Sequence, residues 1–144
     1  MREILFRGQT RRYGEKVRMN GEKVKSNWVY GGIFPNNRGG DFSIIYQQEP
    51  TIEKFTVYSD TVGQYTGLTD KNGTKIFEGD ILEFTDGDDE KIPYLVVWDD
   101  FFSSWHIAQN GDRNFWDDFA DFESERFEVI GNIHDNPELL EVSE

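Results

Sequence analysis

Apolar and polar residues alternate along several short stretches, and residues typical of turns separate these stretches. The segment RFEVIGNI (126–133) alternates in this way, which places its apolar side chains on one face of a strand. YLVVW (94–98) is apolar throughout and rich in β-branched residues, which predicts a strand buried on both faces. In KIFEGDILEF (75–84), Gly79 interrupts the pattern and predicts a bend or bulge. Further strands are expected at 3–7, 42–46, 54–58 and 101–108.

Four dipeptides suit tight hairpin turns between these strands. They are Asn20-Gly21, Asn72-Gly73, Asp86-Gly87 and Asn110-Gly111. A two-residue type I′ turn needs positive φ at both positions, which Asn or Asp followed by Gly adopts at little cost. The chain is therefore expected to form antiparallel hairpins. Gly31-Gly32 and residues 36–40 are expected to form a loop.

Helices are expected to be few and short. Phe115, Trp116, Phe119 and Phe122 recur at helical spacing with acidic residues between them, which predicts a short amphipathic helix. Asn136 before Pro137 predicts a final helical turn. The fold class is therefore mainly β, a barrel or sandwich of small antiparallel sheets with one or two short helices. A seam near 59–62 would divide an N-terminal β region (1–60) from a C-terminal one (61–144) within one compact unit.

Composition narrows the class of protein. The chain has 144 residues, enough for one ordinary domain. It has no Cys, which excludes disulfides, thiolate zinc sites and a cysteine nucleophile, and two His alone cannot make a zinc site. No apolar stretch approaches the roughly 20 residues of a membrane span, and the first residues lack the apolar core of a secretory signal. We therefore expect a soluble intracellular protein without a membrane partner.

Charge is distributed unevenly along the chain. Fifteen basic and 28 acidic residues give a net charge of −13, yet residues 1–40 hold nine basic and three acidic side chains. The basic start could pack near the acidic end of the same chain, both could simply be solvated faces, or they could attract each other in a homo-oligomer. A third alternative is nucleic-acid binding by the basic segment, with the following candidate contacts: Arg7, Arg11, Arg12, Lys16 and Arg18. Most of the 22 aromatic residues should be core, but Trp28, Tyr30 and Phe34, or alternatively Trp105 and Trp116, could form a stacking surface for single strands.

Catalytic patterns are absent from the sequence. It has no Gly-x-Ser-x-Gly elbow and no phosphate-binding glycine loop. His106 lies in a strand pattern and His134 at a strand-to-helix corner, where a structural role is expected for each. The carboxylates at 86–90 lack the spacing of a calcium loop. We therefore expect no catalytic residues, no cofactor and no metal site, although paired carboxylates leave acid-base chemistry open as an alternative.

Several longer motifs resemble one family. They are REILFRG (2–8), WVYG (28–31), TVGQYTGLTDKNGTKIFEGDIL (61–82) and FEVIGNIHDNPELL (127–140). Together they resemble the YopX family of bacteriophage and prophage proteins. The resemblance implies a mostly β protein with an SH3-like barrel in its C-terminal part, made in the cytoplasm of a bacterial host. It implies no activity, cofactor or catalytic residue.

These observations favour a non-enzymatic accessory protein that binds a host or phage protein. Its acidic surface could mimic nucleic acid toward such a partner. The alternative function is direct nucleic-acid binding through the basic N-terminal segment. Homo-oligomer formation is compatible with both.

Overall fold

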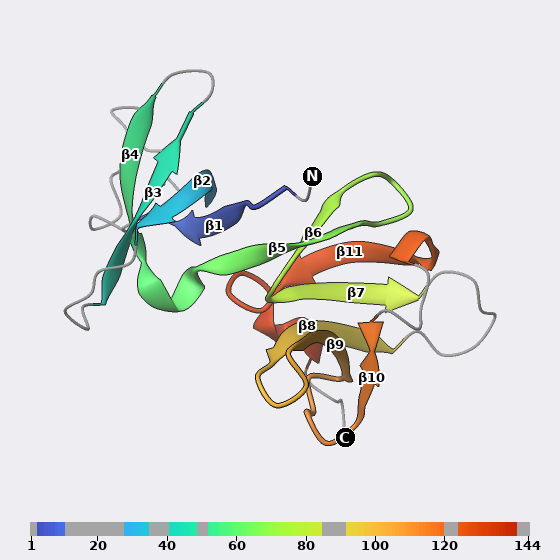
Figure 1. Cartoon of the computed structure of the whole chain (residues 1–144). Coiled ribbons are helices and arrows are strands. Elements are labelled where there is room, and N and C mark those ends of the chain that lie inside the picture. The colour runs from blue at the N-terminus through green and yellow to red at the C-terminus, as the bar shows by residue number, and fades with distance from the viewer. Residues whose placement is uncertain are drawn as a thin grey trace, which may run out of the picture. The chain divides into compact units, whose positions relative to one another are not determined.

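Antiparallel strands dominate this computed structural model, which confirms the mainly β fold class (Figure 1). The structure describes residues 3–10, 28–34, 41–48, 52–84, 92–119 and 124–140. The chain divides into two compact units, Glu3–Gln64 and Tyr65–Glu144.

The first unit is built around four antiparallel strands. They are β1 (Phe6–Gln9), β2 (Trp28–Phe34), β3 (Phe42–Gln47) and β4 (Glu53–Tyr58), followed by the 3-10 turn η1 (Ser59–Thr61). The order across the sheet is β4-β3-β2-β1, and β1 also pairs with Gly63 and Gln64 at the start of β5 (Gly63–Thr69). Val29, Ile45 and Val57 form the buried core on one face of these strands.

The expected loop at Gly31-Gly32 is wrong, because both glycines lie inside β2. The absence of a side chain at Gly31 has a packing reason. A Cβ built there would lie 1.9 Å from the carbonyl oxygen of Tyr46, so only glycine fits. The Gly-Gly pair alone predicts a loop, but packing of β2 against β3 makes this segment a strand.

The second unit contains the rest of β5 and six further strands. They are β6 (Lys75–Phe77), β7 (Asp80–Phe84), β8 (Pro93–Asp99), β9 (Ser104–Gln109), β10 (Trp116–Asp118) and β11 (Phe127–Asn132). The turns η3 (Ser124–Arg126) and η4 (Pro137–Leu140) complete it. β10-β9-β8-β7-β11 form a five-stranded antiparallel sheet, while β6 pairs with β5. No sheet in the described residues is closed, so the SH3-like barrel remains a prediction.

The five-stranded sheet is buried on both faces around β8. Val96 packs with Ile107, Phe119 and Phe127 on one face. Leu95 and Val97 pack on the other face with a second set of apolar residues, which are Ile81, Ala108, Ile130, Ile133, Leu139 and Leu140. This arrangement confirms that the apolar run 94–98 is a strand with two covered faces.

The glycine turns form, but with longer loops than a two-residue turn. Thr69 pairs with Lys75 across the Asn72-Gly73 hairpin, which leaves five residues in the loop. Asn110 and Gly111 do adopt positive φ, 54° and 78°, at the start of the β9–β10 connection. Gly79 forms the expected bend between β6 and β7, with φ of 89°. The other two dipeptides, Asn20-Gly21 and Asp86-Gly87, lie outside the described residues.

The predicted amphipathic helix around 115–122 is wrong at its start, because Trp116–Asp118 form strand β10. Trp116 pairs with Ala108 and Asp118 with His106. Hydrogen bonding to β9 thus overrides the helical spacing of the aromatic residues. The terminal turn predicted after Asn136 is confirmed as η4.

Candidate functional site

One of the five predicted nucleic-acid contacts lies in the described structure. Arg7 is in β1, where it is 6% exposed and its guanidinium carbon lies 4.6 Å from the centroid of the Trp28 ring. This geometry is a cation–π contact. The remaining candidates, Arg11, Arg12, Lys16 and Arg18, lie outside the described residues.

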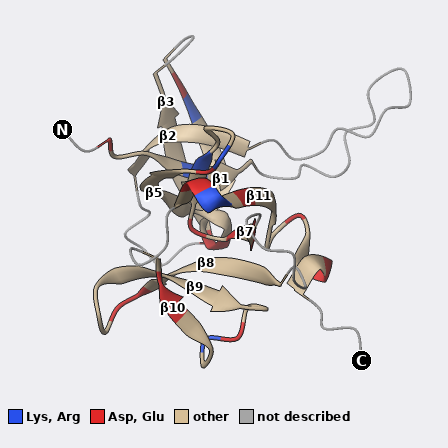
Figure 2. Ribbon diagram, turned by 90° about the vertical axis from the view of Figure 1, so that its right-hand side faces the viewer, with Lys and Arg blue, Asp and Glu red and all other residues tan. Residues whose placement is uncertain are grey.

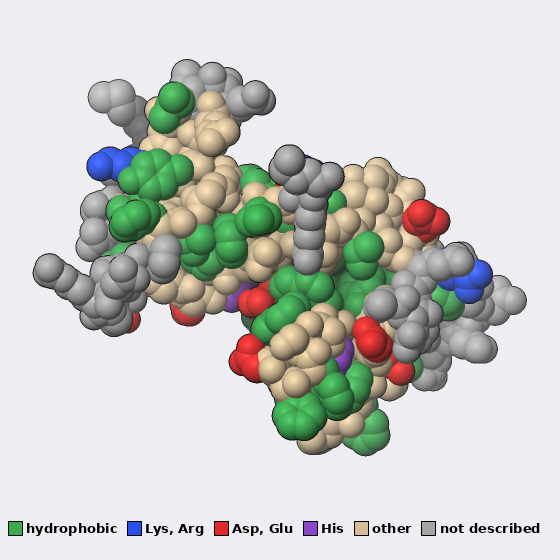
Figure 3. Space-filling model, viewed as in Figure 1, with side chains coloured by type: hydrophobic (Ala, Val, Ile, Leu, Met, Phe, Trp, Pro, Cys, Tyr) green, Lys and Arg blue, Asp and Glu red, His purple; other side chains and the backbone are tan. Residues whose placement is uncertain are grey.

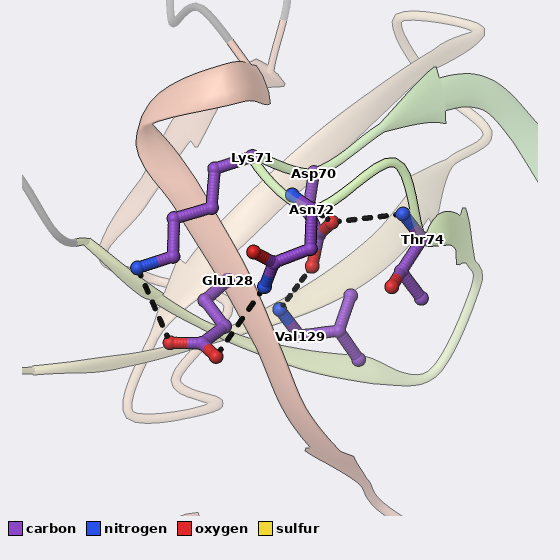
Figure 4. A network of polar contacts seen from close by, with 6 residues as sticks. All are labelled: Asp70, Lys71, Asn72, Thr74, Glu128 and Val129. Carbon is purple, nitrogen blue, oxygen red and sulfur yellow. Dashed lines mark hydrogen bonds and ion pairs between the residues drawn. The ribbon is translucent and has the colours of Figure 1, made fainter.

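Asp70 lies at the centre of a network of hydrogen bonds in the second unit (Figure 4). Asp70 is buried, and its Oδ1 accepts hydrogen bonds from the backbone N–H groups of Asn72 (2.8 Å) and Thr74 (2.9 Å). Its Oδ2 accepts one from the N–H of Val129 at 3.0 Å. One carboxylate therefore closes the β5–β6 hairpin and fastens it to β11.

The electrostatics of Asp70 follow from these contacts. Burial disfavours the charged carboxylate, but the three backbone donors and the nearby Lys71 outweigh it, so the pKa of Asp70 lies below its usual value. Lys71 also pairs with Glu128 at 3.6 Å, where both side chains are 39% exposed. We therefore assign Asp70 and its neighbours a role in fold stability, because the hydrogen bonds and the ion pair described for them lie within the second unit.

The β8–β9 connection holds two phenylalanines in solvent. Asp99 Oδ1 accepts hydrogen bonds from the N–H groups of Phe101 (2.9 Å) and Phe102 (3.0 Å). Asp99 pairs with Ser104 across the hairpin, and Ser103 completes the turn with φ of 49°. An aspartate that accepts from the following residues is a common device for fixing a turn.

The exposed rings form a contiguous cluster. Phe101 is 88% exposed and Phe102 56%, and their ring centroids lie 4.9 Å apart in edge contact. Phe102 also contacts Trp116, which is 41% exposed, at 5.5 Å. Figure 3 shows hydrophobic side chains on the surface at the β8–β9 and β9–β10 connections. We call Phe101, Phe102 and Trp116 the aromatic cluster.

A line of polar side chains lies beneath this cluster. His106 is 2% exposed, and its Nε2 lies 2.9 Å from Ser104 Oγ. Its Nδ1 lies 3.4 Å from Asp99 Oδ2. The Trp116 ring stacks on the imidazole at 3.9 Å. These residues share one face of the sheet because they occupy alternate or paired positions on β8, β9 and β10.

Ser104, His106 and Asp99 are the side-chain types of a serine nucleophile, its base and its acid. The environment of His106 fits a structural role better than a catalytic one. Trp116 and Phe102 lie against the imidazole, and the ring is almost fully buried, which leaves little access for a substrate. Asp99 uses its other oxygen to hold the turn. We therefore interpret His106 as a buried ring that positions Trp116, which is consistent with the structural role expected from the sequence pattern.

His134 also serves the backbone around it. Its N–H donates to Asn132 Oδ1 at 3.0 Å, and the N–H of Asp135 donates to the same atom at 2.9 Å. This geometry fits the turn role that was expected for the β11–η4 corner.

Acidic residues predominate in the strands and turns that carry the aromatic cluster. Asp and Glu outnumber Lys and Arg along β8, β9 and β10 (Figure 2). Over the whole stretch 65–144, the sequence holds 21 acidic and five basic residues. On the opposite face of the sheet, burial, together with the negative charge of Asp117, raises the pKa of Tyr94. The segment that carries the cluster is therefore strongly acidic in composition.

The described residues show neither a metal-binding cluster nor a membrane-spanning helix. No group of three or more His, Cys, Asp or Glu side chains gathers there as a metal site would require. The helices that the structure describes are single turns, too short and too polar to cross a membrane. The carboxylates at 86–90 lie outside the described residues.

Sequence patterns did not single out Phe101 and Phe102, because 101–108 was expected to be one strand. Strand β9 begins at Ser104 instead, and residues 100–103 form the turn. The available signal was Asp99 followed by another Asp, since Asp favours the start of a turn.

Comparison with known proteins places the chain in a family. It is similar to protein EF1440 from Enterococcus faecalis, whose crystal structure it matches with a TM-score of 0.48 and 23% identity, covering 96% of this chain and 99% of that one. No curated protein sequence matches it significantly. The YopX protein family model matches residues 15–141. Because that match covers most of the chain, the protein belongs to the YopX family.

Proposed function

We propose that this chain is a non-enzymatic protein-binding module, encoded by a phage or prophage and acting in the cytoplasm of the bacterial host. The proposed binding surface is the aromatic cluster together with Asp99 and Asp100. The observation that carries the proposal is the pair Phe101 and Phe102, held outward by hydrogen bonds to Asp99.

Exposed phenylalanines at a fixed turn are unusual unless a partner covers them. Large apolar side chains at the surface commonly mark interaction sites when they are contiguous. Aromatic side chains also dominate the energetics of many interfaces. A turn that is already ordered loses less conformational entropy on binding, which raises affinity. Asp99 supplies this order for both rings.

The surrounding charge specifies the chemistry of the partner. Asp100 is exposed beside the rings, and the unit as a whole is strongly acidic. A partner segment that contains arginine or lysine next to apolar residues would satisfy both properties. Its cations would be attracted by the carboxylates and by the faces of the rings. The same charge would suit a protein whose usual ligand is nucleic acid.

The test is a tagged pull-down of the full chain from host lysate, with and without nuclease. The variants are Phe101→Ser/Phe102→Ser and the control Ile52→Ser, which removes an 86% exposed side chain in the first unit. We expect one host protein that survives nuclease, is kept by the control and is lost with the double variant. Loss of two hot-spot rings should weaken binding by about 30-fold or more.

The captured protein is then purified and its affinity measured at two salt concentrations. Binding that weakens steeply with salt supports a basic partner segment. Equal capture by wild type and the double variant would contradict the assigned surface. Capture only before nuclease treatment would favour nucleic-acid binding instead. Light scattering of the purified chain in the same buffers tests the homo-oligomer that the uneven charge predicts.

A further inference from the structure

A second set of exposed aromatic side chains lies on the sheet of the first unit. Residues two apart on a strand share a face, so Trp28, Tyr30, Gly32 and Phe34 of β2 point the same way. The strand register places Tyr46 of β3 opposite Gly32. We call Tyr30, Phe34 and Tyr46 the aromatic face.

The strands do not need this face for their core. The opposite face carries Val29, Ile45 and Val57, each at most 6% exposed. On the aromatic face, Tyr30 is 44% exposed and Phe34 59%. Burial of one face is enough to stabilise a sheet, so three large rings left in solvent indicate a second purpose.

The rings are arranged as a platform with an open position. Phe34 and Tyr46 contact each other edge to face, with 6.4 Å between centroids. Gly32 lies between Tyr30 and Phe34, and a Cβ built on it would meet no atom within 4 Å. Tyr30 and Phe34 are four residues apart, which spans about 13 Å along a strand. A flat ligand of the size of a base therefore has room beside Tyr46.

Charge on this face is positive. Strands β1–β4 place two charged side chains there: Lys54, which is exposed and lies opposite Tyr46, and Arg7, which lies opposite Tyr30 but is buried against Trp28. Glu53, the acidic residue of these strands, pairs with Gln47 on the other face. Figure 3 shows a Lys or Arg side chain beside the hydrophobic side chains of this unit. Residues 1–64 also hold ten basic and seven acidic side chains, in contrast to the acidic remainder.

We propose that the aromatic face binds single-stranded nucleic acid. Bases stack on Phe34, Tyr46 and Tyr30, and Lys54 pairs with a phosphate. Stacking on aromatic rings beside a cation that tracks the backbone is the usual chemistry of single-strand binding, and it tolerates different sequences because every base has a flat face. This surface is separate from the aromatic cluster, so the two proposals can fail independently.

The experiment measures fluorescence anisotropy of a labelled single strand of about 12 nucleotides, as DNA and as RNA, with the full-length chain. Tyr46→Ser and Phe34→Ser should each weaken binding at least about fivefold, because each removes a stacking ring. Lys54→Gln should reduce the slope of log affinity against log salt by about 0.7, the value for one phosphate contact on a single strand. Phe101→Ser/Phe102→Ser is the matched control and should bind normally.

Gly32 provides a sharper test, because its open surroundings accept a side chain. Gly32→Glu and Gly32→Lys should both fold, as circular dichroism and urea unfolding would show. We expect the Glu variant to lose affinity for the single strand and the Lys variant to gain it. Equal affinity of these two variants would overturn the proposal.

Two further outcomes would also overturn it. One is the absence of binding by the wild type at micromolar concentration in low salt. The other is binding that survives Tyr46→Ser and Gly32→Glu but is lost in Arg11→Glu/Arg12→Glu, which would assign it to the basic N-terminal segment. A blunt duplex of the same sequence should bind more weakly than the single strand, because its bases are already stacked.

Discussion

The imidazole of His106 lies parallel to the indole of Trp116, with 3.9 Å between ring centroids and 1° between ring planes. Both nitrogens of the imidazole have polar neighbours, since Ser104 Oγ lies 2.9 Å from Nε2 and Asp99 Oδ2 lies 3.4 Å from Nδ1. Stacking on the buried His106 of β9 therefore holds the Trp116 ring, which is 41% exposed, in one orientation. In this way a buried polar side chain supports the surface that we propose for partner binding.

His106→Ala should destabilise the protein by about 1–3 kcal/mol, because it removes a buried ring and leaves the polar groups around it without their partner. Ser104→Ala should cost less, about 0.5–1.5 kcal/mol, since it removes one hydrogen bond and keeps the stacking. Urea unfolding measures both free energies. The NMR signal of the Trp116 indole should shift in His106→Ala and stay near its position in Ser104→Ala. An unmoved indole signal in His106→Ala would contradict the positioning role.

Asp70→Asn should lower the free energy of unfolding at pH 7 by about 1–3 kcal/mol. The carboxylate accepts three backbone hydrogen bonds, and an amide can replace only some of them. Asp100→Asn is the matched control, because Asp100 is exposed and should leave stability within about 0.5 kcal/mol of wild type. Equal stability of the two variants would contradict the assigned role of Asp70.

The same residue predicts a pH dependence. Because the pKa of Asp70 is lower in the folded state, its contribution is fully present above the ordinary carboxyl pKa, 3.8. It is lost as the pH falls through the lowered folded-state value. Wild-type stability should therefore decline on acidification below about pH 4 more steeply than that of Asp70→Asn. Urea midpoints measured between pH 7 and pH 2.5 compare the two slopes, and parallel curves would exclude Asp70 as a source of the decline.

Two neighbouring glycines should respond oppositely to the same substitution. Gly31→Ala places a Cβ where the Tyr46 carbonyl oxygen lies, so the backbone must move, at a cost of at least about 2 kcal/mol. Gly32→Ala meets nothing and should be neutral or slightly stabilising, since alanine restricts the unfolded chain. Urea unfolding of both variants checks the contrast. A Gly31→Ala variant as stable as wild type would show that the close approach of β2 to the Tyr46 carbonyl of β3 is not required for folding.

The strands were predictable wherever local pattern and tertiary burial agree. The run 94–98 became β8 because each of its faces meets a separate set of apolar residues. The pattern at 126–133 became β11, and Asn136-Pro137 began a helical turn, because turn chemistry is local. The helix predicted around 115–122 is wrong at its start for the opposite reason. Pairing of Trp116 with Ala108 on β9 depends on a neighbour that spacing alone does not reveal.

The candidate surfaces were less predictable than the strands. Trp28, Tyr30 and Phe34 were recognised as a possible stacking set because they are aromatic residues near the basic N-terminal segment, and the strand does place them on one face. Tyr46 and Lys54 join that face through strand register, which a single sequence does not give. The aromatic cluster needs Asp99 to fold back on two backbone N–H groups, and this contact became visible only in the structure.

Asp99→Ala separates the positioning of the cluster from its contacts, because it keeps Phe101 and Phe102 but removes their hydrogen-bond acceptor. The amide hydrogens of both phenylalanines should then exchange faster with solvent, and affinity for the captured partner should fall about tenfold, since binding must now order the turn. Asp100→Ala removes a neighbouring carboxylate that is exposed, so it should leave the exchange rates unchanged and weaken binding only through charge.

The salt dependence of binding distinguishes the loss of turn order in Asp99→Ala from the loss of charge in Asp100→Ala. The loss in Asp99→Ala should persist at high salt, whereas the loss in Asp100→Ala should disappear as the charges are screened. Equal loss in both variants that vanishes with salt would mean that Asp99 acts by charge and that the ordered turn contributes nothing to recognition.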